Sequence, residues 1–349
     1  MNIKSFDKKL FNIKKKINIL EIIPTNVIEE RDKFFDEIEK GRKYNPQFKY
    51  HKYKHNLDKI IDDLNKLEAD DSIMGVLLKQ RRNELVNMAF LLKHIGSQDV
   101  TDYFIKLFGK PDKKLVNEAK KFLHKKIIVS ETKKKQFLDT RQIKERIEQA
   151  FKKHNINGWK VKEKNIPSIA AVLPSAKTLY LRKKVRLSND FLNKMIVHEV
   201  ENHIFRAENG AKQPYKLFSM GFPNYLVTEE GLAIYSEEKL KMNFERRLRN
   251  CAARVVAADL MQKKSFYEIY NFFTQYFTPQ KSFRLAARAK RGMGDTSKKG
   301  GCVKDYIYFK GYLLIKNYLR KGGDLKKLYI GKIGVEHMPL LKEIEGLKL

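Results

Sequence analysis

The sequence lacks several features that would each point to a particular class of protein. Its 349 residues include two cysteines, Cys251 and Cys302, which lie far apart, so a disulfide framework is not expected and the chain fits a reducing cytosol. No run of eighteen or more apolar residues occurs, which argues against a membrane-spanning helix. Residues 1–16 have no apolar core of the kind that a secretory signal peptide needs. These absences predict a cytoplasmic protein.

Acidic residues are scarce relative to basic ones. The chain has 73 Lys+Arg against 41 Asp+Glu, a formal net charge of +32 at pH 7. A field of that size attracts polyanions, and nucleic acid is the first partner that it suggests. The lysines are spread along the whole sequence, however, and no nucleic-acid-binding motif accompanies them. We therefore expect the charge to favour acidic partners, and nucleic acid is not the favoured ligand.

The first third of the chain has the periodicity of helices. Residues 27–41 read as a helix of alternating charge. Apolar residues recur every three or four positions in residues 57–67, 73–95, 100–108 and 113–123. Residues 1–20 repeat the pattern as a basic amphipathic segment, which either lies on an anionic membrane or, as we expect, packs on the protein itself. The lysine-rich stretch 125–135 then marks the best boundary. We predict an N-terminal helical region over residues 1–125 and a second domain over residues 126–349.

The period of the apolar residues changes after a helical stretch at 140–154. Residues 159–162, 169–173 and 178–181 read as short strands, and residues 174–177 as the turn between the last two. A further helix follows around Met195. The fold class predicted is therefore α+β and mostly helical, with a small sheet beside that helix. The sheet either offers a free edge to an extended peptide or only stabilises the fold, and the sequence is compatible with both.

The helix around Met195 carries a pattern typical of a metal site. His198 and Glu199 are followed by His203, and a second acidic pair, Glu229 and Glu230, opens the next predicted helix, for which Thr228 is a suitable N-cap. Neutral imidazoles and a carboxylate are the ligands that a catalytic zinc takes, with one position left for water. A glutamate beside the first histidine is placed to take that water's proton.

The spacing of the two histidines makes a structural demand. Ligands four positions apart lie about 40° apart around an α-helix, whereas five positions give about 140°. His198 and His203 therefore bind one metal ion together only if a π-bulge absorbs the extra residue. The pattern also arises by chance on surface helices. Here the apolar stripe of the helix, including Val200 and Ile204, favours buried histidines that need a partner.

These residues resemble those of a known family. The series from His198 to Gly210, followed by Thr228 to Ala233, is similar to the bacterial "QEGLA-motif" proteins, also called flavohemoglobin expression-modulating. Their eukaryotic relatives are the microtubule-associated tyrosine carboxypeptidases, which are zinc enzymes. Three further segments fit the same series: Asn45–Tyr50, Leu107–Pro111 and Lys304–Gly311. The resemblance extends from about Asn45 to Leu319. Thr228-Glu229 and Glu201-Asn202 depart from the usual pattern.

The resemblance implies a fold and a set of roles. It implies a zincin-like catalytic domain in which His198, His203 and Glu230 bind zinc. Glu199 takes the position of the general base. Lys304 and Tyr308 are candidates for binding the substrate, the tyrosine by a hydrogen bond to the oxyanion, and these two rest on the resemblance alone.

Arg206 has two possible roles. It lies three residues after His203 and so on roughly the same face of the helix. It binds a substrate carboxylate with two hydrogen bonds, or it pairs with Glu199, Glu201 or Glu237 as part of the structure. The sequence leaves both roles open.

Taken together, the sequence predicts a zinc-dependent peptidase. The resemblance implies a carboxypeptidase that releases a C-terminal residue from peptide or protein tails, and the charge favours acidic tails. The alternative is a basic binding protein for nucleic acid or acidic protein partners, with a structural or vestigial metal site. Tubulin itself is not implied as the substrate.

Overall fold

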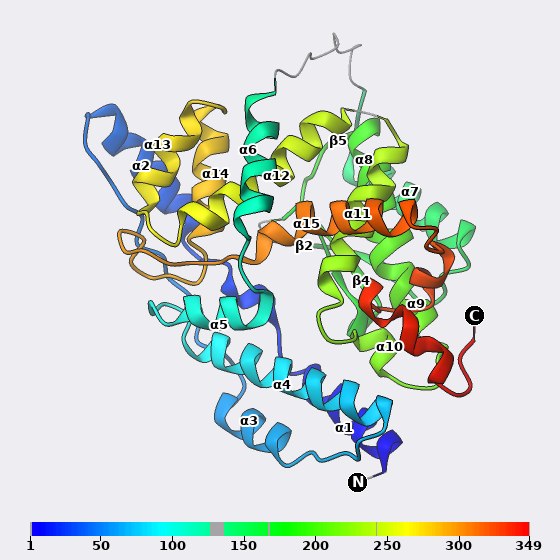
Figure 1. The fold of residues 1–349 in the computed structure, drawn as a ribbon. Coiled ribbons are helices and arrows are strands. Elements are labelled where there is room, and N and C mark those ends of the chain that lie inside the picture. The colour runs from blue at the N-terminus through cyan, green and yellow to red at the C-terminus, as the bar shows by residue number, and fades with distance from the viewer. Residues whose placement is uncertain (1, 126–135, 167, 242, 349) are drawn as a thin grey trace. The chain divides into compact units, whose positions relative to one another are not determined.

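The computed structural model describes residues 2–125, 136–166, 168–241 and 243–348. The chain divides into two compact units, each assembled from separate stretches (Figure 1). The first unit comprises residues 1–70, 75–126 and 245–310, and the second comprises residues 71–74, 127–244 and 311–349. Of the lysine-rich boundary predicted at 125–135, all but residue 125 lies outside the described residues, so the two-domain division stays a prediction.

The described part of the first unit is helical. Its elements are α1 (Ile3–Lys14), η1 (Ile19–Ile22), α2 (Val27–Glu39), α3 (Leu57–Asn65), α4 (Ile73–Lys93), α5 (Val100–Phe108), α6 (Lys113–His124), α12 (Phe244–Leu260), α13 (Phe266–Thr274), α14 (Pro279–Ala289) and η4 (Lys304–Tyr306). Helix α15 (Ile307–Arg320) starts in this unit and continues in the second. The five helices predicted between residues 27 and 123 are all present, with starts that agree and ends within two residues.

The amphipathic N-terminal segment folds as α1. Asn2 caps it by accepting a hydrogen bond from the Lys4 backbone N–H at 2.9 Å. Phe6 and Leu10, on its apolar stripe, are fully buried. The stripe therefore packs on the protein itself, as expected. None of the described helices is long and apolar enough to cross a membrane.

The second unit combines helices with two small sheets. Its elements are β1 (Phe137–Leu138), α7 (Thr140–Lys153), β2 (Lys160–Lys164), β3 (Ala170–Leu173), η2 (Pro174–Ala176), β4 (Thr178–Arg182), β5 (Leu187–Ser188), α8 (Asn189–Met195), η3 (Ile196–Ile204), α9 (Phe205–Ala211), α10 (Leu217–Met220), α11 (Leu226–Lys239), η5 (Lys326–Tyr329) and η6 (Val335–Glu343). The predicted class, α+β and mostly helical, is confirmed.

The three predicted strands form one sheet in the order β2-β4-β3. Strand β2 is parallel to β4, and β3 is antiparallel to it. Leu179 and Leu181 point from β4 into a core cluster that also contains Val200 and Ile204 of η3. All four side chains are completely buried. The sheet therefore fixes the helix that carries the predicted metal ligands.

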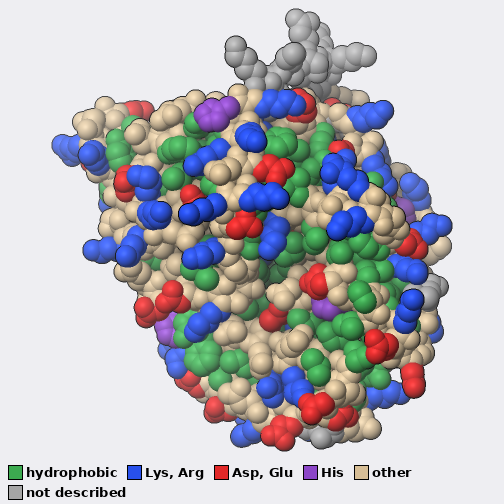
Figure 2. Space-filling view, viewed as in Figure 1, with side chains coloured by type: hydrophobic (Ala, Val, Ile, Leu, Met, Phe, Trp, Pro, Cys, Tyr) green, Lys and Arg blue, Asp and Glu red, His purple; other side chains and the backbone are tan. Residues whose placement is uncertain are grey.

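Basic side chains are dispersed over one face of the molecule (Figure 2). On the face drawn in Figure 2, lysine and arginine side chains are spread widely, with acidic side chains between them. This distribution agrees with the even spread of lysine along the sequence.

Candidate metal centre

The segment η3, from Ile196 to Ile204, is a π-helix inserted between α8 and α9. A turn of π-helix holds one residue more than an α-turn, so residues five apart come onto one face. The rings of His198 and His203 accordingly lie with their centroids 5.0 Å apart. The Asn202 side chain supports the widened turn by donating to the Val197 carbonyl at 2.6 Å. The predicted distortion of this helix is confirmed.

Helix α11 supplies the carboxylates that face the histidines. It begins at Leu226, two residues before the predicted cap Thr228. The prediction was wrong at this point because Thr228 is fully buried inside the helix. Its hydroxyl oxygen instead accepts a hydrogen bond from the Val335 backbone N–H at 2.9 Å. Glu229, Glu230 and Glu237 all lie on α11, and each is buried.

Helix α11 is held very close to α15. An added Cβ on Gly231 would lie 2.3 Å from the carbonyl carbon of Gly311, and one on Gly311 would lie 2.1 Å from the Val227 carbonyl oxygen. Only glycine permits this approach. The crossing therefore sets the position of Glu230, the residue next to Gly231.

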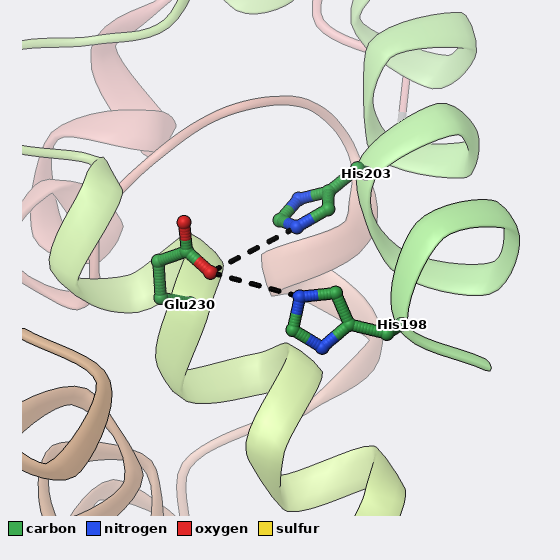
Figure 3. A group of neighbouring side chains, drawn as sticks. All are labelled: His198, His203 and Glu230. Carbon is green, nitrogen blue, oxygen red and sulfur yellow. Dashed lines mark ion pairs between the residues drawn. The ribbon is translucent and has the colours of Figure 1, made fainter. Parts of the chain in front are cut away.

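Figure 3 shows the group formed by His198, His203 and Glu230. The Glu230 Oε2 atom lies 3.8 Å from His198 Nε2 and 3.9 Å from His203 Nε2. The three donor atoms lie within 4.8 Å of one another. Zinc takes such ligands at about 2.0–2.2 Å in a tetrahedron, which separates donor atoms by roughly 3.3 Å. Small side-chain movements would bring the three atoms to that separation.

The strongest indication of a missing partner is on Glu230. Its Oε2 atom is buried and has no hydrogen-bond partner among the described residues. A buried carboxylate oxygen without a partner is costly. A cation between this oxygen and the two imidazoles would satisfy it. The donor set of two imidazoles and one carboxylate therefore fits zinc.

The other nitrogen of each imidazole is held by a carboxylate. His198 Nδ1 lies 2.8 Å from Glu237 Oε1, and His203 Nδ1 lies 2.9 Å from Glu229 Oε1. Each Nδ1–H can donate to its carboxylate, which leaves the Nε2 lone pair directed at Glu230. Both histidines are thus oriented as metal ligands usually are. The sequence placed Glu237 seven residues after Glu230, on the same face of the helix, where it could orient a metal ligand or pair with Arg206, and the contact with His198 is the first of these roles. Glu229 had no contact assigned from the sequence.

Two cations balance the charge of Glu229. Arg206 Nη1 forms an ion pair with Glu229 Oε2, and Lys332 Nζ lies 3.3 Å from Glu229 Oε1. Burial alone would raise the pKa of Glu229, but Lys332, Arg206 and His203 together lower it far below its usual range. Glu229 is therefore an anion. Lys332 has no sequence signal that links it to this site.

Arg206 is completely buried and fully engaged. Its Nε donates to the Leu328 carbonyl at 3.0 Å and its Nη2 to the Ile333 carbonyl at 2.6 Å, while Nη1 pairs with Glu229. Its partner is none of the three carboxylates considered from the sequence. Of the two roles left open for Arg206, the geometry favours the structural one, because no atom of the guanidinium is exposed to a substrate.

The site as a whole attracts positive charge. Burial by itself would lower the pKa of His203. The hydrogen bond and charge of Glu229, with the charges of Glu230 and Glu199, outweigh burial and raise the pKa. The same carboxylates would stabilise a divalent cation bound at Nε2.

Glu199 differs from the other glutamates of the site. It lies on η3 beside His198, it is partly exposed, and no described residue forms a hydrogen bond with its carboxylate. Its charge nevertheless acts on His203. A carboxylate that is near the metal group but still open to solvent can exchange protons with water.

Lys304 and Tyr308 belong to the first unit. Lys304 begins η4 and is partly exposed, and Tyr308 lies in the first turn of α15. The guanidinium of Arg254 lies over the Tyr308 ring, 4.7 Å from its centroid. Their substrate-binding roles remain expectations that rest on the resemblance.

Comparison with known proteins identifies relatives over most of the chain. A family model described as MATCAP, microtubule-associated tyrosine carboxypeptidase, matches residues 32–349. A Mus musculus protein named microtubule-associated tyrosine carboxypeptidase 1 is 25% identical over 331 residues, which is 93% of this chain and 62% of the relative. A second Mus musculus protein, provisionally named tyrosine carboxypeptidase MATCAP2, is 33% identical over 161 residues, 44% of this chain and 30% of the relative. The matched part of the chain thus covers under a third of the length of one relative and about three fifths of the length of the other.

Proposed function

Because the chain belongs to the microtubule-associated tyrosine carboxypeptidase family, we propose that it is a zinc-dependent peptidase that releases a C-terminal residue from peptide or protein tails. We propose that His198, His203 and Glu230 bind the zinc ion. The observation that carries this proposal is the buried Oε2 of Glu230, which faces two Nε2 atoms and has no hydrogen-bond partner among the described residues.

The chemistry of such a site divides between the metal and the chain. Zinc, when bound, lowers the pKa of a water molecule and polarises the carbonyl group of a substrate. Glu199 removes a proton from water and delivers it to the leaving amine, a role that suits its partly exposed carboxylate. Glu237 and Glu229 hold the imidazoles so that Nε2 stays directed at Glu230.

An extended peptide can add to an outer strand of the three-stranded sheet, β2 or β3. Strand β4 is the central strand, so it has no free edge, although it precedes the metal-bearing helix in the sequence. Strand β3 (Ala170–Leu173) borders the sheet and contacts η3. A peptide added along β3 by main-chain hydrogen bonds would run beside the metal-bearing helix. We propose β3 as the peptide-binding edge of a zincin-like site.

A carboxypeptidase must also hold the terminal carboxylate. A carboxylate in a partly dry site needs a fixed cation, or its loss of hydration is not compensated. Arg206 is occupied by Glu229, so another cation would have to supply that anchor. The charge of +32 favours acidic tails, by an attraction that weakens as the salt concentration rises.

The proposal is tested with matched peptides that end in tyrosine, the residue in the family description. An acidic peptide with a free C-terminal carboxylate should lose one residue, detected by mass spectrometry. The same peptide with an amidated C-terminus should remain intact, because the anchoring charge is gone. Internal cleavage of both peptides at similar rates would make the protein an endopeptidase.

A further inference from the structure

A cavity lies in the same unit as the metal centre. It has a volume of about 700 Å³. The metal-bearing helix contributes Val197, Glu201 and, just beyond η3, Phe205, which recur every fourth residue. His198, His203 and Glu230 do not line it. The cavity is therefore a separate feature on another face of that helix.

The walls of this cavity are suited to an apolar group. Val197, Phe205, Leu240, Leu325 and Ile330 line it together with the ring of Tyr329. The rings of Phe205 and Tyr329 lie 6.1 Å apart, centroid to centroid. Cavities of roughly 300–1,000 Å³ with mostly apolar walls and a few polar groups are the usual form of small-molecule sites. This cavity falls within that range.

Its rim is positively charged. Four exposed lysines line the cavity: Lys212, Lys239, Lys326 and Lys348. No carboxylate in the described part of the chain pairs with any of the four. By contrast, Lys177 in the same unit pairs with Glu208 at 3.0 Å. The four ammonium groups therefore have no carboxylate partner among the residues that the structure describes, and that of Lys239 lies over the Tyr235 ring, 5.4 Å from its centroid.

The single acidic residue of the lining is already engaged. Glu201 Oε1 lies 2.9 Å from His154 Nε2. Its charge offsets at most one of the four lysines, so the lining carries a net positive charge. An anion that enters the cavity meets attraction from several directions.

The neutral polar groups of the cavity are also engaged, and they hold its walls together. Asn209 Nδ2 donates to the Tyr329 carbonyl at 2.9 Å, and Gln213 Nε2 donates to the Lys348 carbonyl at 2.8 Å. The Tyr329 hydroxyl donates to Asn202 Oδ1 at 2.7 Å. These bonds connect Tyr329 and Lys348 to the metal-bearing helix and the residues that follow it. A ligand can therefore make apolar contacts inside the cavity. A negatively charged group on that ligand can bind the lysines at the rim.

We propose that this cavity binds a small organic anion that has an apolar body, such as a medium-chain carboxylate. The apolar body lies between Phe205 and Leu325, and the anionic group is held by the rim lysines. This site is independent of the proposed peptidase activity, because it uses none of the candidate metal ligands.

The test uses an anionic fluorescent probe, 1-anilinonaphthalene-8-sulfonate, with the full chain. Octanoate should displace the probe from one saturable site. Octanol, which has the apolar body without the charge, and acetate, which has the charge without the body, should fail at the same concentration. Equal displacement by octanol would overturn the requirement for an anion.

Two kinds of variant locate the binding. Leu325→Trp, which fills the cavity, should abolish octanoate binding, and the double variant Lys212→Gln/Lys326→Gln should weaken it at least about tenfold, the scale of one lost charge-assisted contact. A control, Lys162→Gln/Lys183→Gln, removes two exposed lysines of the same unit that do not line the cavity. Unchanged binding in the Lys212/Lys326 variant, or equal loss in the control, would show that the cavity is not the site.

Discussion

Arg206 and Glu229 form an ion pair that is almost completely removed from solvent, with side-chain exposures of 0% and 2%. Removing one partner of such a pair leaves an uncompensated buried charge, which costs about 3–5 kcal/mol. Arg206→Ala should therefore lower the free energy of unfolding by about that amount. The loss should lie near the lower limit of this range, because Lys332 remains near Glu229. Urea unfolding measures the change.

The same variant separates the two roles of Arg206. A structural role predicts lower stability with little change in KM for a free-acid peptide in the fraction that stays folded. Unaltered stability together with a large rise in KM would instead make Arg206 the anchor of the substrate carboxylate.

The carboxylates behind the histidines should control metal affinity. Glu229→Gln and Glu237→Gln each keep the shape of the side chain but weaken the hydrogen bond to Nδ1 of His203 or His198. Loss of such a partner typically costs 10–100-fold in metal affinity. Competition with a zinc chelator measures the effect. Glu238→Gln is the matched control, because Glu238 lies on the same helix but pairs with Lys316. The zinc affinity of this variant should equal that of the parent protein.

Glu199 should matter for hydrolysis and not for metal binding. Glutamine in its place has the same size but cannot accept the proton, so Glu199→Gln should retain zinc and lose about 10²–10⁴-fold in the hydrolysis rate. Glu201→Gln, on the same helix and paired with His154, should hydrolyse at the parent rate. Comparable turnover by Glu199→Gln would mean that another group carries the proton.

His337 should make the stability of the protein depend on pH. Burial lowers the pKa of His337 to about 4, from an ordinary value of 6.5. Between these values the unfolded chain binds more protons than the folded chain, so stability falls as the pH falls from about 6.5 to about 4. The loss is on the order of 3 kcal/mol. In His337→Gln this part of the pH dependence should vanish, and identical pH profiles of stability for parent and variant would contradict the assignment.

The sequence predicted those features that depend on local periodicity. Strands β2, β3 and β4 follow from the change to short apolar runs, and the π-helix follows from the five-residue spacing of His198 and His203. Several features that it missed depend on tertiary contacts or on very short elements. Strands β1 and β5 have two residues each, too few for a period to be visible.

The partners of the metal ligands illustrate the same limit. Glu229 looked like an ordinary acid of a first helical turn, yet it lies between His203, Arg206 and Lys332. Asn209-Gly210 has the form of a left-handed C-cap, which predicts that the metal-bearing helix ends there. That prediction was wrong, because Gly210 lies inside α9, where a Cβ would meet the Phe218 carbonyl oxygen at 2.2 Å. In both cases the contacts come from other segments of the chain, so no local sequence pattern predicts them.

The most direct test of the metal centre is the zinc content of purified His203→Ala. The parent protein should hold one zinc ion per chain, and His203→Ala should lose most of it while its helical circular-dichroism signal stays largely intact. His154→Ala, which removes a histidine outside the proposed ligand set, should keep the parent content. Zinc retained at the parent level in His203→Ala would contradict the assignment of His198, His203 and Glu230.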